Sequence, residues 1–389
     1  MRKLRVGIFS ECYHPVLNGV VVSIDTFRAE LEKLGVEYFI FTTEVPEYQD
    51  DDPRVIRFSS MVPFKSGGGR YPIAWPRLVG KEAERVASLD IDLVHSQHLL
   101  SVGHLGLKIA MNLGIPSVLT YHTLLAEYTH YVPLFGPLSR EYLIKKSRNI
   151  CNQYDQIVTP SPSMKRVLRE YGVRRPIEPI PTGVNVDDFQ GPLSRKAVEE
   201  KWKIPKKSKI LLYVSRIAEE KNVDFLLRAA KSLAEKRDDF CLLLIGGGPK
   251  LEEFQKLVRE WGLEKRFIFT GMLPKDETNR YFGAADIFVF SSITETQGIV
   301  ITEAMAAGVP AVAVAIMGPS DIIINGQDGY LVPLKEDIFA AKINELLEDN
   351  ELRTKMGKSA KVNALKYSQQ KCAEKMLSIY EKLIHRHHS

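Results

Sequence analysis

Short apolar runs alternate with longer amphipathic stretches from the first residues to about residue 335. Such runs, bounded by turn residues, are typical of strands that are buried on both faces of a sheet. The stretches between them, such as Ser23–Leu34 and Val102–Leu113, have the length of crossover helices. The pattern therefore predicts an α/β fold built on parallel sheets. The predicted strands are Leu4–Phe9, Tyr38–Thr42, Asp92–His95, Ser117–Thr120, Gln156–Thr159 and Ile177–Ile180 in the first half, and Ile210–Val214, Phe240–Ile245, Phe267–Thr270, Ile287–Phe290, Ala311–Val314 and Tyr330–Val332 in the second.

A turn-rich segment, Pro181–Asn185, separates the two sets of strands. With 389 residues the chain is also too long for one ordinary hydrophobic core. We therefore expect two Rossmann-like, doubly wound domains, residues 1–184 and 185–367, whose ligand sites face one another across a cleft. Residues 368–389 are predicted to form a C-terminal helix and tail that packs back on the first domain.

The composition is that of an ordinary soluble globular protein, with 44% apolar and 26% charged residues. No apolar stretch approaches the roughly 18 residues of a membrane-spanning helix, and the apolar run at the start has the length of a strand rather than of a signal peptide. The four cysteines are far apart and form no Cys-x-x-Cys motif, so we expect neither a disulfide framework nor a zinc site. These features predict a cytoplasmic protein without a metal.

The formal net charge of +5 is mild and does not indicate a nucleic-acid partner. Its distribution is uneven, because the segment Ser139–Arg175 holds nine basic residues and three acidic ones. Two interpretations stay open for this segment. It forms solvated helix faces, or it forms a patch that contacts an anionic membrane, where each basic residue contributes on the order of 1 kcal/mol.

Two glutamates follow the predicted strand Ile287–Phe290. Glu295 lies in the loop after the strand, and Glu303 lies in a helix of small and apolar residues, roughly 12 Å further along if the residues between are helical. Carboxylates at that spacing can hold two ends of an extended polar ligand, and free N–H groups at the helix start near Gly298 suit an anion between them. The alternative is that a glutamate near a helix start only stabilises the helix. We favour a binding site, because an unpaired Glu303 would be costly in an apolar helix.

Arg216 and Lys221 follow the first strand of the second half and are separated by a loop rather than by helical spacing. They can therefore converge on one anion, for which a diphosphate is well suited; the alternative is a solvated loop. Gly246, Gly247 and Gly248 do not match the Gly-x-Gly-x-x-Gly pattern, so a dinucleotide cofactor is not indicated.

In the first half, Gly19 opens a helix after the first strand, where its N–H could approach a phosphate. A plain turn is the alternative for this glycine. His122 lies just after the strand Ser117–Thr120, at the carboxyl end where ligands bind in α/β sheets. The alternative for His122 is a packed or solvated side chain.

The combination of Glu295-x7-Glu303 with the following Ala-Met-Ala-Ala-Gly-Val-Pro resembles the signature of the retaining nucleotide-sugar glycosyltransferases with the GT-B fold, known as glycosyl transferases group 1 or family 4. The loop from Arg216 to Lys221 is also similar to this family. Asn18-Gly19 stands where the family usually has two adjacent glycines. The resemblance implies transfer of a hexose from a nucleotide-diphosphate sugar with retention of the anomeric configuration and without a cofactor.

The resemblance also implies roles for single residues. Glu303 would hold the ribose, Arg216 and Lys221 the diphosphate, and Glu295 the hexose hydroxyls, while His122 and Gly19 reach the donor from the first domain. The implied catalytic residues are His122, Arg216, Lys221 and Glu295. The implied donor-binding residues are Gly19, Arg216, Lys221, Glu295, Thr296, Gln297, Gly298, Ile299 and Glu303.

The acceptor is indicated by the stretch Glu127–Pro133, which resembles a loop of bacterial 1,2-diacylglycerol 3-alpha-glucosyltransferases. A packed aromatic loop is the alternative. The implied acceptor residues are His14, Tyr128, His130 and Tyr131. We thus expect transfer of glucose from UDP-glucose to diacylglycerol at the cytoplasmic face of a membrane. A soluble or phosphoinositide acceptor, a nucleotide-sugar epimerase and a non-catalytic nucleotide-binding protein stay open, as do the base, the sugar and the oligomeric state.

Overall fold

The computed structural model of the chain divides into two compact units. Unit 1 comprises Met1–Gly183 together with Gln369–Ser389, and unit 2 comprises Val184–Ser368. The structure describes residues 2–16, 18–58, 62–66, 69–73, 84–124, 136–189 and 195–388. Within that part of the chain, no helix combines the length and the apolar character needed to cross a membrane.

Unit 1 is built on a sheet of seven strands in the order β3-β2-β1-β6-β7-β8-β9, and every neighbouring pair is parallel. The loops that follow β1, β6 and β7 therefore meet at the same edge of the sheet. The strands are β1 (Leu4–Phe9), β2 (Val36–Thr43), β3 (Val55–Phe58), β6 (Leu93–Ser96), β7 (Ser117–Thr120), β8 (Gln156–Thr159) and β9 (Ile177–Pro179). An antiparallel pair, β4 (Val62–Ser66) and β5 (Gly69–Ile73), lies outside this sheet.

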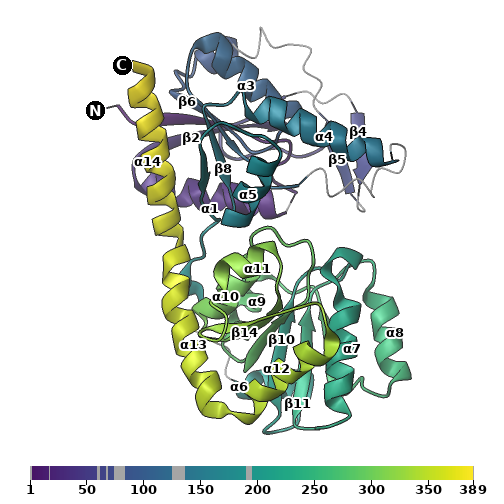
Figure 1. Ribbon diagram of the computed structural model, residues 1–389. Coiled ribbons are helices and arrows are strands. Elements are labelled where there is room, and N and C mark those ends of the chain that lie inside the picture. The colour runs from purple at the N-terminus through teal and green to yellow at the C-terminus, as the bar shows by residue number, and fades with distance from the viewer. Residues whose placement is uncertain are drawn as a thin grey trace. The chain divides into compact units, whose positions relative to one another are not determined.

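Helices cover both faces of the unit 1 sheet (Figure 1). One face packs against α1 (Gly19–Lys33) and α14 (Gln369–His388), and the other packs against α3 (Ser101–Leu113). Two further helices, α4 (Gly136–Cys151) and α5 (Pro162–Glu170), flank β8 along the chain. Because successive strand residues point to opposite faces, both sets of side chains must be apolar, which explains the continuous apolar runs in the sequence.

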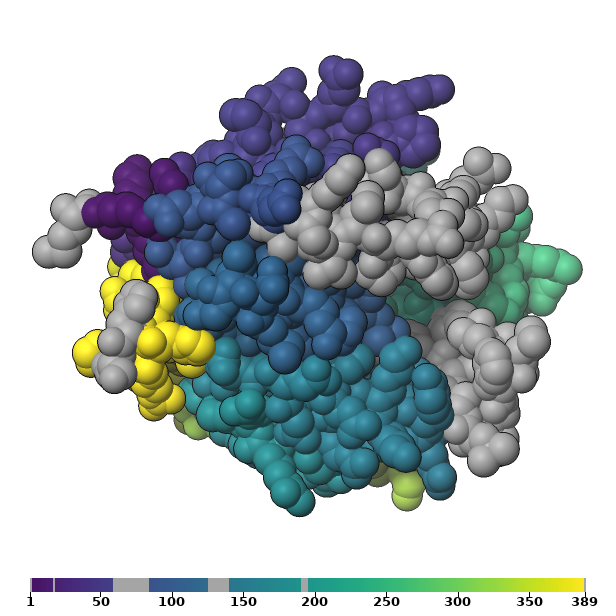
Figure 2. Space-filling view, turned by 90° about the horizontal axis from the view of Figure 1, so that it is seen from above, coloured from purple at the N-terminus to yellow at the C-terminus, as the bar shows by residue number. Residues whose placement is uncertain are grey.

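The C-terminal helix α14 is part of the unit 1 core. The hydroxyl of Tyr380 lies 2.6 Å from Nδ1 of His95 and 3.1 Å from the hydroxyl of Tyr38, and Nε2 of His95 lies 2.7 Å from Oγ1 of Thr120. Burial lowers the pKa of His95 to about 3, so this imidazole is neutral and has one N–H to donate. Figure 2 shows the yellow end of the chain beside its purple start on the surface of unit 1.

Unit 2 is built on a six-stranded parallel sheet in the order β12-β11-β10-β13-β14-β15. Helices α7 (Val223–Ala234) and α12 (Glu336–Glu348) pack on one face, and α10 (Ile299–Ala306) and α13 (Asn350–Ala364) pack on the other. The strands are β10 (Lys209–Val214), β11 (Phe240–Ile245), β12 (Phe267–Gly271), β13 (Ile287–Phe290), β14 (Ala311–Val314) and β15 (Gly329–Val332). The remaining helices are α6 (Arg195–Trp202), α8 (Leu251–Glu260), α9 (Lys275–Phe282) and α11 (Met317–Ile322).

The predicted α/β fold with two doubly wound parallel sheets is confirmed. Every strand expected from the sequence is present, with ends that differ by a few residues. The sequence pattern did not predict β3, which is a short strand at the edge of the sheet, or the pair β4 and β5.

Candidate functional site

The candidate donor site of unit 2 lies where β10 and β13 end. These two strands are neighbours in the sheet, although they are far apart in the chain. The loop after β10 carries Arg216 and Lys221, and the loop after β13 carries Glu295. Because both strands run in the same direction, the fold brings the two predicted loops side by side.

Lys221 and Glu295 form an ion pair in which Nζ lies 2.9 Å from Oε2. Only 21% of the lysine side chain and 19% of the glutamate side chain are exposed. The other oxygen, Oε1, accepts a hydrogen bond of 3.1 Å from the backbone N–H of Gly298. Burial raises the pKa of Glu295, but Lys221 and the N–H groups of Gly298 and Gln297 outweigh burial, so the pKa lies below its usual value. The carboxylate is therefore ionised at neutral pH.

Four further hydrogen bonds connect the two loops. The hydroxyls of Ser292 and Thr294 donate to the carbonyl oxygen of Glu220 at 3.3 and 3.4 Å. The Ser291 hydroxyl donates to the carbonyl of Lys221 at 3.1 Å, and the Asn222 amide donates to the carbonyl of Ser291 at 3.3 Å. The loops thus hold each other in place, and the Lys221–Glu295 pair has a defined position before any ligand binds.

Arg216 lies on the same loop but makes a different contact. Its NH2 group lies 2.7 Å from Oε1 of Glu220, and 51% of its side chain is exposed. The structure therefore does not bring Arg216 into the Lys221–Glu295 pair. Because half of its side chain is in solvent, this guanidinium has room to rotate toward a phosphate.

The three glycines after β11 support the Arg216 loop, a role that the sequence pattern did not indicate. The N–H of Ile217 donates to the carbonyl of Gly247 at 2.8 Å. A Cβ atom on Gly246 would lie 1.9 Å from the carbonyl oxygen of Ser215, and one on Gly248 would lie 2.3 Å from that of Ile217. The signal was the position of the glycines after a buried strand, where the backbones of adjacent loops approach closely.

The helix α10 starts at the end of the β13 loop, as expected. Gly298 has φ +85° and stands just before the first helical residue, Ile299. Gly318 on α11 holds the loop from the other side, since its N–H donates to the carbonyl of Glu295 at 3.0 Å. A Cβ atom on Gly318 would lie 2.7 to 2.9 Å from backbone atoms of Gln297, so a glycine is needed there.

Glu303 lies within α10 and is partly buried. Burial raises the pKa of Glu303; the positive charge of Lys275 lowers it and the negative charge of Asp188 raises it further. Within the described residues, the carboxylate of Glu303 has no side-chain hydrogen bond and no ion pair. A carboxylate left in this state gains stability when a ligand hydroxyl donates to it.

In unit 1, His122 lies at the carboxyl end of β7. Its Nε2 lies 2.8 Å from Oε1 of Gln97, which follows the neighbouring strand β6. Burial, with smaller contributions from His98 and His95, lowers the pKa of His122 to about 3. The imidazole is therefore neutral, and its Nε2–H donates to the Gln97 oxygen, which leaves Nδ1 as an acceptor.

Gly19 is the first residue of α1, and Asn18 caps this helix. The Asn18 side-chain oxygen accepts 3.0 Å hydrogen bonds from the N–H groups of Val20 and Val21. The asparagine in place of a second glycine thus satisfies two of the helix-start donors. Among the described residues, no atom outside its chain neighbours and its own helix backbone lies within 4 Å of a Cβ built on Gly19. Its contact with a phosphate stays a prediction.

His14 faces α1, since its Nε2 lies 2.8 Å from Oδ2 of Asp25. The other predicted acceptor residues, Tyr128, His130 and Tyr131, lie outside the described residues. Glu11 was not predicted, although it follows β1 at the same edge of the sheet. Burial raises the pKa of Glu11 to about 7, and its N–H donates to Nδ1 of His98 at 3.1 Å. A polar residue directly after the first strand was the available signal.

No group of three or more metal-ligating His, Cys, Asp or Glu side chains is present in the part of the chain that the structure describes. Of the described residues, Arg216 and Lys221 are the cations on the loop after β10.

Two family models match the chain. The model described as "Glycosyl transferases group 1" matches residues 194–363, and the one described as "Glycosyltransferase Family 4" matches residues 17–188. The chain is 32% identical to an alpha-monoglucosyldiacylglycerol synthase of Streptococcus pneumoniae, over 88% of this chain and 78% of the relative. It is 29% identical to the alpha-monoglucosyldiacylglycerol synthase of Acholeplasma laidlawii, over 98% of both chains.

Solved structures share the fold. Sucrose-phosphate synthase from Thermosynechococcus elongatus matches with a TM-score of 0.77 at 21% identity, over 99% of this chain and all of the other. The Anabaena protein HepE, in complex with UDP, matches with a TM-score of 0.78 at 16% identity, over 98% of this chain and all of the other.

Proposed function

The chain belongs to the glycosyltransferases of group 1 and family 4 and is a hexosyltransferase with the GT-B fold, and from this premise we propose that it transfers glucose from UDP-glucose to diacylglycerol at a membrane surface. The proposal includes retention of the anomeric configuration. The observation that carries it is the Lys221–Glu295 ion pair, held between two cross-linked loops at the carboxyl edge of the unit 2 sheet.

The ion pair offers two kinds of contact to a nucleotide sugar. The Lys221 ammonium would bind the donor diphosphate, and the Glu295 carboxylate would accept hydrogen bonds from the hexose hydroxyls. Arg216 would leave Glu220 and bind the same diphosphate, because a guanidinium matches two phosphate oxygens at once. The two cations would stabilise the charge that develops on the leaving diphosphate.

Glu303 would bind the ribose of the donor. Its carboxylate accepts no hydrogen bond within the described residues, and the two ribose hydroxyls could donate hydrogen bonds to it. The HepE structure described above is a complex with UDP, and this likeness favours UDP as the leaving group here.

The proposed reaction forms one carbon–oxygen bond, breaks another and moves one proton. The acceptor oxygen bonds to the anomeric carbon while the bond from that carbon to the diphosphate oxygen breaks and leaves its electrons on the diphosphate. The acceptor proton moves to that same leaving oxygen on the same face of the sugar, so the anomeric configuration is kept and no carboxylate nucleophile is required. Neutral His122 would accept a hydrogen bond from a donor-sugar hydroxyl through Nδ1 and so orient the sugar.

The acceptor is proposed from the relatives. Both relatives described above are named as synthases of alpha-monoglucosyldiacylglycerol, and together they align with most of this chain. A diacylglycerol acceptor resides in a membrane, so the enzyme would work as a peripheral protein on the membrane surface. Gly19 and His14 lie at the same sheet edge as His122. Gly19 would contact the sugar donor, and His14 would contact the acceptor.

The test is an incubation of the protein with radiolabelled UDP-glucose and vesicles of diacylglycerol and phosphatidylglycerol, followed by extraction into organic solvent. Label in the organic phase, and none there when diacylglycerol is omitted, is the expected result. Label in a new water-soluble product would instead identify a soluble acceptor. The proposal would be contradicted if UDP-glucose, UDP-galactose and GDP-mannose all stay intact. It would also be contradicted if the sugar is converted without release of the nucleotide, which is the result that an epimerase would give.

A further inference from the structure

Besides Arg216 and Lys221 of unit 2, the protein has a group of arginines in unit 1. They lie at the edge of the unit 1 sheet opposite to the edge that carries His122. The loop between α5 and β9 and the C-terminal end of α4, with the residue after it, line a surface pocket of about 830 Å³. It is lined by Arg148, Asn152, Gly172, Arg174, Arg175 and Pro176. These residues precede β8 and β9, so the pocket lies at the amino ends of the parallel strands, whereas His122 lies at their carboxyl ends.

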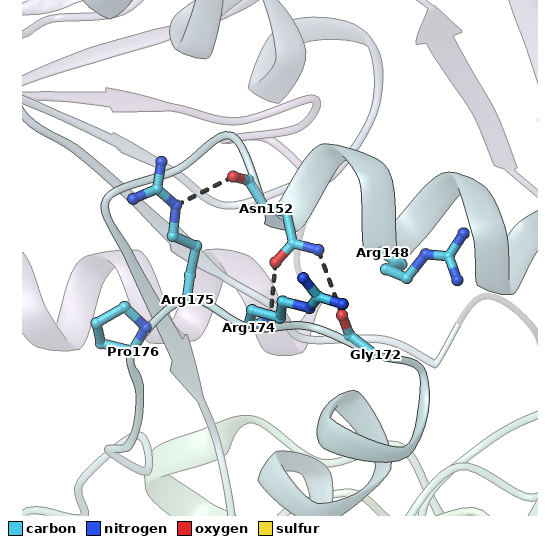
Figure 3. Close-up of a pocket in the computed structure, with 6 residues that line it drawn as sticks. All are labelled: Arg148, Asn152, Gly172, Arg174, Arg175 and Pro176. Atoms are coloured by element: carbon cyan, nitrogen blue, oxygen red, sulfur yellow. Dashed lines mark hydrogen bonds between the residues drawn. The ribbon is translucent and has the colours of Figure 1, made fainter.

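Asn152 holds the pocket together (Figure 3). Its side-chain oxygen accepts a 2.7 Å hydrogen bond from the N–H of Arg174, and its side-chain amide donates to the carbonyl of Gly172 at 3.3 Å. The backbone carbonyl oxygen of Asn152 accepts a 3.0 Å hydrogen bond from Nε of Arg175. One asparagine thus fixes the backbone of Arg174 and the side chain of Arg175 against the end of α4, and the terminal nitrogens of Arg175 remain for another partner.

Gly172 lets Arg148 join the two other arginines. It has φ +85°, which L side chains rarely adopt, and a Cβ atom there would lie 3.0 Å from Cδ of Arg148. The aliphatic part of Arg148 therefore lies across the glycine. Arg148 lines the pocket from α4, and Arg174 and Arg175 line it from the loop before β9. In Figure 3 the guanidinium group of Arg148 points away from those of Arg174 and Arg175.

The described residues do not neutralise the positive charge of this pocket. No ion pair joins a carboxylate to Arg148, Arg174 or Arg175 among the described residues. The carboxylate of Asp155 is close in sequence, but it accepts hydrogen bonds of 2.9 Å from the N–H and hydroxyl of Ser117 and lies 3.7 Å from His387. Three guanidinium groups around one pocket, without an acidic partner, attract an anion.

We propose that Arg148, Arg174 and Arg175 form a binding site for a phosphate group, separate from the site that would bind the sugar donor. A guanidinium donates two parallel hydrogen bonds to the oxygens of one phosphate, which makes arginine the side chain best suited to this group. The phosphate can belong to the headgroup of an anionic phospholipid or to a free phosphorylated molecule. This site does not depend on which sugar or acceptor the enzyme uses.

The experiment measures binding of inorganic phosphate to the full-length protein by ³¹P NMR line broadening at low salt. Saturating UDP is present, so that phosphate does not report the nucleotide site. The test variant is Arg148→Gln/Arg174→Gln/Arg175→Gln. The control variant is Arg85→Gln/Arg259→Gln/Arg280→Gln, which removes the same charge from exposed arginines elsewhere. We expect the test variant to lose at least about tenfold in affinity and the control to bind as the original chain does.

A second variant, Arg174→Gln/Arg175→Gln, leaves the packing of Arg148 on Gly172 intact and should also lose affinity. Phosphate binding that is equal in the test and control variants, or absent from the original chain, would overturn the proposal. Sedimentation with phosphatidylglycerol vesicles then distinguishes the source. Vesicle binding that is reduced in the test variant and displaced by phosphate identifies a lipid headgroup, and unchanged vesicle binding with lost phosphate binding identifies a free phosphorylated ligand.

Discussion

Nζ of Lys221 lies 2.9 Å from Oε2 of Glu295, although the two residues are 74 positions apart in the chain. The pair exists because β10 and β13 are adjacent parallel strands whose following loops meet. The second carboxylate oxygen is bonded to the Gly298 N–H, so the glutamate holds the lysine while the backbone holds the glutamate. A cation placed in this way needs little rearrangement to meet a diphosphate, which is the condition for electrostatic stabilisation of a leaving group.

The first prediction concerns Lys221. Lys221→Ala should lower kcat by about 100-fold to 1000-fold, because it removes a preorganised cation from the leaving group. The N–H of Gly298 still stabilises Glu295, so the free energy of unfolding should fall by only about 1–2 kcal/mol. Turnover and thermal unfolding are measured on the same preparation. Lys256→Ala, at a lysine on α8 that is 75% exposed, is the control and should change neither value. Activity of Lys221→Ala within a few-fold of the original would remove the lysine from the reaction.

The second prediction concerns Glu303. Glu303→Gln should weaken UDP binding by about 10-fold to 100-fold, because a carboxylate accepts stronger hydrogen bonds from ribose hydroxyls than an amide oxygen does. The value of kcat at saturating donor should change less, since the ribose is remote from the reacting carbon. Isothermal titration calorimetry with UDP checks the affinity, and Glu253→Gln on α8 provides the matched control. Equal UDP affinity in both variants would rule out the ribose contact.

The third prediction concerns Gly318. Gly318→Ala should lower kcat by about tenfold or more, since the new methyl group would lie 2.7 to 2.9 Å from backbone atoms of Gln297 and would push the Glu295 loop away. Overpacking of this kind costs roughly 1–3 kcal/mol of stability. Ser320→Ala, on the same helix and exposed, should have full activity. A Gly318→Ala variant with normal kcat would show that the loop tolerates displacement.

The fourth prediction follows from the pKa of Glu11, which burial raises to about 7 from a usual value of 4.5. Between these pH values the unfolded chain releases the proton and the folded chain keeps it, so Glu11 costs stability as the pH rises from 4.5 to 7. Glu11→Gln removes this cost. The free energy of unfolding of Glu11→Gln minus that of the original chain should increase by roughly 2–4 kcal/mol between pH 4.5 and 7. The difference should stay constant above about pH 7.

Calorimetric unfolding of both chains at about pH 5, 6, 7 and 8 measures this difference for Glu11. The exposed Glu84 supplies the control, because Glu84→Gln should show no such trend. Parallel pH curves for Glu11→Gln and the original chain would mean that the carboxyl group is already ionised in the folded protein at the lowest of these pH values.

The fifth prediction concerns metal ions. Transfer activity should be kept in EDTA, because in the proposed function Arg216 and Lys221 would supply the positive charge that a divalent cation would otherwise provide at the diphosphate. Rates are compared after dialysis against chelator, with and without added Mg²⁺. Complete loss of activity that Mg²⁺ restores would show that the two side chains do not suffice.

Much of the fold was predictable because parallel strands are buried on both faces. Strands such as Phe240–Ile245 are apolar at every position and stand out from the amphipathic helices around them. The strand β3, Val55–Phe58, was missed because it lies at the sheet edge and includes a partly exposed arginine, Arg57, which binds Asp50. Edge strands of this kind do not have the apolar run of a central strand.

The site was predictable in its residue types but not in its contacts. A donor site was indicated by the spacing of Glu295 and Glu303 and by the loop position of Arg216 and Lys221. The family models support membership of the glycosyltransferase family. The roles of the single residues stay predictions. The glycines at 246–248 and 318 gave no recognisable motif, since their importance comes from atoms of other segments that approach within 3 Å of their missing Cβ atoms.

By itself, the amino-acid sequence determined the α/β class, the strands other than β3, β4 and β5, and the glycosyltransferase family. These depend on local patterns of apolar residues and on spacings within one loop and helix. Only the tertiary structure decided which charges meet. Lys221 pairs with Glu295 and Arg216 with Glu220, while Arg148, Arg174 and Arg175 gather around Asn152 without an acidic partner among the described residues. The physical reason is that strand order in a parallel sheet sets which loops are neighbours, and that order depends on the packing of the whole unit rather than on any one segment.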